Sequence, residues 1–120
     1  MSDHLKVGLA QIAPVWLNKK ATLDKVEQCI AEASDNAADL VVFGEALVPG
    51  YPFWVEHTDG AVFESAVQKE IYAHYVKHAI SVASGDLHRI CERAKAGNTA
   101  VYLGVIEKAK DRGINIMIEN

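Results

Sequence analysis

The residue in this sequence that is best placed for chemistry is Glu45, an acidic side chain that closely follows a short apolar run. The run ends at Phe43, and a turn with two prolines and a glycine follows at residues 49–52. An apolar run bounded by turn signals is typical of a strand buried on both faces. Ligands and catalytic groups gather outside the carboxyl ends of such strands. The pattern therefore predicts a strand end that carries a carboxylate.

A carboxylate in this position has two interpretations. In the first, Glu45 hydrogen-bonds the backbone of its own turn or caps the next helix. In the second, it is a general base, which requires burial by aromatic neighbours so that the carboxylate can accept a proton near neutral pH. The candidate neighbours are Phe43, Tyr51, Phe53 and Trp54. The local pattern supports both equally. The prolines of the 49–52 turn fix two φ angles, and this pre-organised frame slightly favours the catalytic interpretation.

Cysteines and histidines are the other residue types with chemical potential. Cys29 and Cys91 lack CxxC spacing, and each falls among the apolar positions of an expected helix, which predicts buried structural thiols. His74 and His78 share a helix face, but no third ligand is near in the sequence, so a surface face is expected rather than a zinc site. His57 is expected in a solvated loop at residues 56–60.

The elements that must position Glu45 follow from the apolar periodicity. We expect three strands, at residues 5–13, 40–43 and 99–106. We expect helices of about eighteen residues after Asn18, from about Phe63 to Lys77, and from Ser84 to a stop at Gly97. Strands that alternate with helices predict an α/β fold. Residues 114–118 alternate between isoleucine and other residues and are compatible with one more strand.

The second expected helix carries apolar residues at four-residue steps, namely Phe63, Val67, Ile71 and Tyr75. The other two expected helices also have a recognisable inward side. In the first, the apolar stripe is Leu23, Val26, Ile30, Ala33 and Ala37, and its wet side includes Lys19, Lys20, Lys25, Glu27 and Glu32. In the third, the inward residues are Leu87, Ile90, Cys91 and Ala94. These stripes predict that both helices pack against the sheet.

Length and composition exclude several classes of protein. The chain has 120 residues, of which half are hydrophobic and 23% charged, so it is globular and about one domain long. A net charge of −4 without a basic stripe gives no support to a nucleic-acid or anionic-membrane partner. No segment approaches the ~18 apolar residues of a membrane span, and the N-terminus has no secretory pattern. A cytoplasmic location is expected.

Residues 43–54, Phe-Gly-Glu-Ala-Leu-Val-Pro-Gly-Tyr-Pro-Phe-Trp, resemble the first catalytic motif of the nitrilase (carbon–nitrogen hydrolase) superfamily. Residues 7–11 with Pro14 resemble the family's first strand, and residues 102–107 resemble its next core strand. The resemblance covers residues 5 to about 113, and residues 114–120 depart from it. Gly44 and the Phe53-Trp54 ending are more similar to the nitrilase and cyanide-hydrolysing branch than to the amidases.

This resemblance implies a fold, a reaction and a setting. The fold is a four-layer α-β-β-α sandwich, of which residues 1–120 would form the N-terminal part. The reaction is hydrolysis of a nitrile by a glutamate, lysine and cysteine triad without metal or organic cofactor, in a homo-oligomer. Glu45 corresponds to the general base, Tyr51 matches a tyrosine of the same turn, and Tyr51 and Trp54 are the implied substrate-pocket residues.

The lysine and cysteine of the triad have no counterpart in this sequence. Cys29 and Cys91 lie outside any segment that resembles the family's nucleophile, and Lys108 and Lys110 lie too near the third strand to match its lysine. We therefore expect a partial nitrilase domain that is inactive alone. The alternatives are a non-enzymatic remnant or assembly module of the same fold, and an amidase-branch member.

Overall fold

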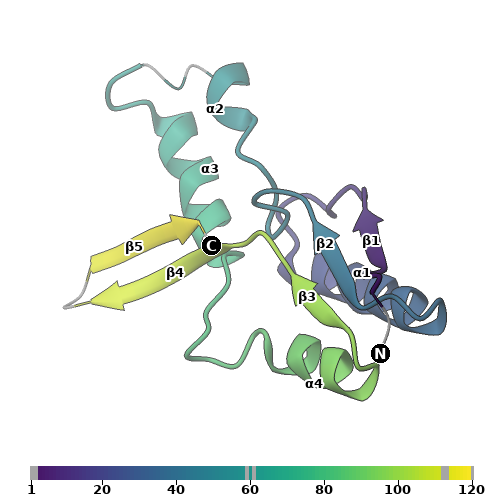
Figure 1. Cartoon of the computed structure of the whole chain (residues 1–120). Coiled ribbons are helices and arrows are strands. Elements are labelled where there is room, and N and C mark those ends of the chain that lie inside the picture. Colours follow the sequence, from purple (N-terminus) through teal and green to yellow (C-terminus); the bar gives the residue numbers. More distant parts are fainter. Residues whose placement is uncertain (1–2, 59, 61, 112–113, 120) are drawn as a thin grey trace.

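The structure is a computed structural model that describes residues 3–58, 60, 62–111 and 114–119. Its chain order is β1 (Val7–Ala10), α1 (Lys19–Asp35), β2 (Leu40–Phe43), α2 (Trp54–His57) and α3 (Ala66–Lys77). The order continues with α4 (His88–Ala96), β3 (Ala100–Tyr102), β4 (Ile106–Asp111) and β5 (Ile114–Glu119) (Figure 1). The alternation of parallel strands and helices confirms the α/β class.

A parallel sheet with the order β1-β2-β3 holds the Glu45 turn at its centre, since Glu45 follows the middle strand. Leu40 of β2 lies opposite Val7 of β1 and Ala100 of β3. The middle strand has the bounds that the sequence predicts, whereas β1 is shorter than the expected run of residues 5–13.

One face of this sheet forms the core. Val41 and Phe43 of β2 are buried together with Val26 and Ile30 of α1 and Ile90 of α4, and α1 and α4 contact each other. The opposite face remains open in the described part of the chain. Its residues alternate with the core residues along each strand, and the most exposed are Leu9 at 74% and Tyr102 at 67%. A sheet that is apolar on both faces is typical of parallel sheets covered on both sides.

The first helix begins where the sequence predicts. The Asn18 side chain accepts a hydrogen bond of 3.0 Å from the Ala21 amide and caps α1. Two expectations on this helix are wrong. Glu27 is buried rather than wet, because Arg89 of α4 pairs with its carboxylate at 3.2 Å, and Ala37 lies beyond the helix end with a φ of 58°.

The later helices differ more from the expectations. Ser84 does not cap α4, which begins at His88 with Leu87 as the capping residue and no side-chain cap; Ser84 instead bonds Ser81 in the preceding turn. Cys91 is exposed on α4 and Cys29 is half-buried, so the expectation of two buried thiols is wrong for Cys91.

The segment between β2 and α3 is also more structured than expected. Residues 54–57 form the short helix α2 in place of the expected loop start, and His57 is exposed as predicted. The next helix, α3, begins at Ala66 with Ser65 as its cap, and Phe63 precedes it with 90% of its surface exposed. The expected start at Phe63 is therefore three residues early.

The expected third strand is split into two. After Tyr102 the chain leaves the parallel sheet, and β4 pairs with β5 as an antiparallel hairpin (Figure 1). Residues 114–119 thus form the additional strand that their alternation allowed. In the described part of the chain, no helix is both long and apolar enough to cross a bilayer.

Candidate functional site

Glu45 lies in a turn directly beyond the carboxyl end of β2, as its place in the sequence predicts. The side chain is exposed, so the expectation that aromatic neighbours bury it is wrong for this structure. Tyr51 and Phe53 are themselves about half exposed, and no ring contact or hydrogen bond joins any described aromatic side chain to Glu45. The site therefore presents a solvent-facing carboxylate on a defined backbone.

That backbone is tightly folded. Ala46 adopts a left-handed conformation with a φ of 47°, and the Gly50 amide donates a hydrogen bond of 3.1 Å to the Ala46 carbonyl. Left-handed φ values in residues other than glycine are uncommon and are maintained by the surrounding structure. The turn is also buried beneath Glu45, since residues 46–50 are buried. The carboxylate thus projects from a turn that has little freedom to move.

Three segments from elsewhere in the chain hold this turn. The Leu17 amide donates to the Pro49 carbonyl at 3.2 Å, and the Ile106 amide donates to the Val48 carbonyl at 2.9 Å. The Tyr75 hydroxyl of α3 donates to the Gly50 carbonyl at 2.8 Å, inside the core. Because these donors come from the β1–α1 loop, β4 and α3, three separate parts of the fold hold the turn that carries Glu45.

The two expected pocket residues face different surroundings. The Tyr51 ring lies 4.9 Å from the Phe53 ring, and the Trp16 ring lies 5.8 Å from the same Phe53 ring. The Trp54 ring instead packs edge-on against Tyr75 at 5.7 Å. The Trp54 indole nitrogen is buried without a hydrogen-bond partner among the described residues. The structure therefore places Tyr51 in an exposed aromatic row and Trp54 against α3.

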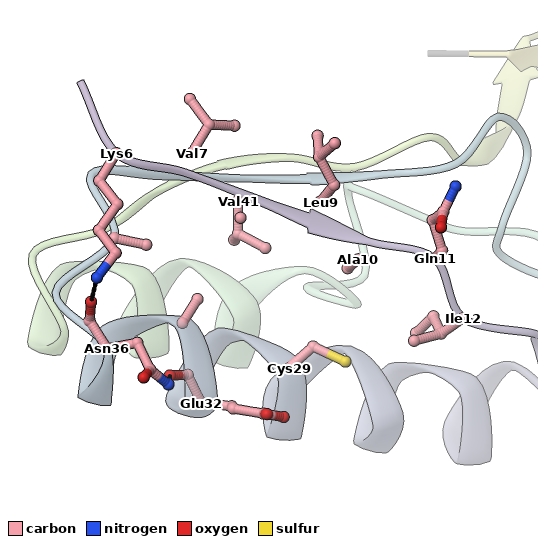
Figure 2. A pocket seen from close by; sticks show the side chains of 13 residues that line it. Lys6, Val7, Leu9, Ala10, Gln11, Ile12, Cys29, Glu32, Asn36 and Val41 are labelled. Atoms are coloured by element: carbon pink, nitrogen blue, oxygen red, sulfur yellow. Dashed lines mark hydrogen bonds between the residues drawn. The ribbon is translucent and has the colours of Figure 1, made fainter. Parts of the chain in front are cut away.

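The two cysteines lie on helices α1 and α4, which are not among the segments that donate hydrogen bonds to the Glu45 turn. Cys29 lies on α1 and lines a pocket between α1 and β1, together with Ala10 and Ile12 (Figure 2). Burial raises the pKa of the Cys29 thiol, the Glu32 carboxylate raises it further, and Lys25 opposes the rise. A thiol with a raised pKa is a poor nucleophile because the thiolate is the reactive form.

Sequence reasoning missed the residues that hold the turn. Tyr75 was recognisable as an inward position of α3, but nothing in the pattern indicates that its hydroxyl reaches Gly50, 25 residues away. A Cβ on Gly50 would lie 3.1 Å from the nearest ring atom of Trp16, which is a tight contact, and the φ of 127° at this position favours glycine. The only sequence signal for either contact is the Pro-Gly turn itself.

The chain matches known proteins along almost its entire length. The family model described as carbon-nitrogen hydrolase matches residues 6–118. An arylacetonitrilase of Aspergillus oryzae is 37% identical over 105 residues, which are 88% of this chain and 29% of that protein. An aliphatic nitrilase of Rhodococcus rhodochrous is 33% identical over 109 residues, 89% of this chain and 28% of that protein. The chain thus spans less than a third of the length of these relatives.

Proposed function

Because the chain belongs to the carbon-nitrogen hydrolase family, we propose that it is part of a nitrilase in which Glu45 is the general base. The observation that supports this proposal is the position of Glu45 at the carboxyl end of the central strand, on a turn whose residues 48–50 accept hydrogen bonds from three other segments. Pre-organisation of this kind is what a catalytic base requires. An acidic residue that only satisfies its own turn would not need it.

The chemistry requires two further groups that this chain does not supply. The Glu45 carboxylate would accept the proton of a cysteine thiol, and the thiolate would then attack the nitrile carbon to form a covalent thioimidate. A lysine would stabilise the developing negative charge on nitrogen. Addition of two water molecules in succession would release ammonia and the carboxylic acid and regenerate the thiol. The chain thus contributes the base and the turn that holds it.

The substrate and setting of the complete enzyme are part of the proposal. Relatives described as an arylacetonitrilase and an aliphatic nitrilase support a nitrile substrate, with Tyr51 and Trp54 at the pocket. We expect a cytoplasmic homo-oligomer that binds neither nucleic acid nor membrane, in line with the net charge of −4.

A non-enzymatic assembly module is the second candidate function. The observation that favours it is the placement of the cysteines, since Cys29 is on the α1 side of the sheet and Cys91 is exposed on α4. An amidase is the third candidate, and Gly44 with the Phe53-Trp54 ending disfavours it.

The isolated chain provides the first test. Purified 1–120 is incubated with a panel of aromatic and aliphatic nitriles, and ammonia is measured. We expect no release above that of a Glu45→Ala control, because the base has no nucleophile to activate. Release that depends on Glu45 would show that this chain carries its own nucleophile and would contradict the proposal.

A chimera tests the role of Glu45 directly. The chain's aligned segment replaces the matching 105 residues of the Aspergillus oryzae arylacetonitrilase, so that the relative supplies the rest of the enzyme. We expect the chimera to hydrolyse phenylacetonitrile and Glu45→Gln to lower kcat by roughly 10²–10⁴-fold, the range typical of a lost general base. Full activity of the Glu45→Gln chimera would exclude this role, and the assembly module would then be favoured.

A further inference from the structure

The backbone that carries Glu45 lies unusually close to a glycine from a distant part of the sequence. A Cβ atom at position 104 would lie 2.4 Å from the Gly44 carbonyl oxygen, 2.9 Å from the Ala46 nitrogen and 3.0 Å from the Glu45 Cα. Cβ atoms in proteins almost never come within 3.0 Å of another heavy atom, so the first two separations require a shift and the third is at the limit. Gly104 is buried, and all three atoms belong to the backbone on either side of the carboxylate.

The clash could not be relieved by a small local movement. The sheet pairs Val42 with Tyr102 just before the contact, and a bridge joins Val48 to Val105 just after it. The two segments are therefore pinned together on both sides of Gly104. Any side chain at this position would have to displace the turn of residues 44–46, where Ala46 already holds a left-handed φ.

From this geometry we infer that Gly104 is a positioning residue for Glu45, which sets where the carboxylate stands relative to the sheet. The inference rests on the proposed role of Glu45 as the general base. Gly104 contacts no reacting atom and acts only through the backbone of its neighbour. A displacement of ~1 Å at a catalytic group can lower a rate by about 100-fold, so a single methyl group here should act on catalysis.

The close approach is first measured in the unmodified chain. Nuclear Overhauser contacts between the Gly104 α-protons and the amide protons of Glu45 and Ala46 are expected to be strong, although 59 and 58 residues separate them in the sequence. Absence of these contacts in an assigned spectrum of the folded chain would overturn the inference without any substitution.

The effect of a side chain is then measured with a matched pair of variants. Gly104→Ala should shift the amide resonances of Glu45 and Ala46. Gly8→Ala serves as the control, because a Cβ at position 8 of β1 would meet its neighbours at 3.7 Å or more. Equal shifts at residues 45 and 46 in the two variants would overturn the inference.

The catalytic consequence is measured in the chimera. Gly104→Ala should lower kcat by about 100-fold while KM stays close to that of the parent. Because a smaller folded fraction would also lower the apparent kcat at unchanged KM, the folded fraction of each variant is measured by circular dichroism and kcat is expressed per folded enzyme. Gly8→Ala is again the control and should leave kcat unchanged, since a Cβ at position 8 of β1 meets its nearest neighbour at 3.7 Å. An unchanged kcat in Gly104→Ala overturns the inference. An inactive parent chimera would count against the proposed function, while the spectroscopic comparison would still decide whether Gly104 positions Glu45.

Discussion

At the scale of single residues, the most informative interaction outside the Glu45 turn joins α3 to the start of α1. The Nδ1 atom of His78 accepts a hydrogen bond of 3.2 Å from the Lys19 amide, which only the unprotonated ring can do. Burial lowers the pKa of His78 below its ordinary value of 6.5, and the nearby His74, Lys77 and Lys19 lower it further. The histidine pair that the sequence placed on one helix face is therefore also a contact between helices.

This hydrogen bond predicts a pH dependence of stability. Folding lowers the pKa of His78. The contribution of the neutral ring to the free energy of unfolding is therefore fully present above about pH 6.5, and it is lost as the pH falls through the lowered pKa. Urea unfolding should show that the free energy of unfolding decreases between pH 7.5 and pH 5, and that this decrease is smaller in His78→Asn than in the wild type. The Asn side-chain oxygen accepts the same hydrogen bond without titrating. The control His57→Gln changes an exposed histidine of α2 and should show the same decrease as the wild type. An identical loss in His78→Asn would contradict the prediction.

At the scale of elements, features encoded by neighbouring residues were predictable and features set by packing were not. The Asn18 cap and the bounds of β2 follow from local sequence and are confirmed. The start of α4 is set by the turn before it, in which the Asp86 carboxylate accepts a bond of 2.7 Å from the Ser81 amide and pairs with Lys19 at 2.8 Å. No pattern near Ser84 reveals that pairing, because Lys19 is 67 residues away.

The two capping expectations make a matched test. Asn18→Ala should lower the free energy of unfolding by about 1 kcal/mol, since it leaves the first-turn amide of Ala21 without its partner. Ser84→Ala should lower the free energy of unfolding by less than Asn18→Ala does, because the Ser84 side chain bonds the Ser81 hydroxyl and caps no helix. Chemical unfolding monitored by circular dichroism measures both. A larger loss for Ser84→Ala than for Asn18→Ala would contradict the assignment of the caps.

At the scale of the whole molecule, the sequence indicates the family and the α/β class but not how the chain closes around Glu45. The contacts from Leu17, Tyr75 and Gly104 to this turn all join residues far apart in the sequence. Periodicity reports which side of an element faces inward and says nothing about which distant atom it meets. The position of Glu45 at a strand end was therefore predictable, whereas the residues that hold its turn required the structure.

The open face of the parallel sheet predicts how the isolated chain behaves in solution. Val7, Leu9 and Tyr102 are exposed on one side of the sheet, and apolar surface of this kind favours association. We expect the chain to self-associate with increasing concentration, and the double variant Leu9→Lys/Tyr102→Lys to reduce this. Phe63→Lys, which changes an equally apolar but distant residue, should not. Sedimentation velocity distinguishes the outcomes, and association that persists in the double variant would contradict a role for this face.

The packing of Trp16 on Gly50 also gives the site a natural optical probe. The indole ring lies over the turn that follows Glu45 and is 43% exposed, so its fluorescence depends on how much water reaches that turn. The chain has two tryptophans, and Trp54→Phe would leave Trp16 as the sole emitter. Any molecule or polypeptide segment that covers the turn should shift this emission to shorter wavelengths, which allows occupancy beside the carboxylate to be followed without turnover or labelling.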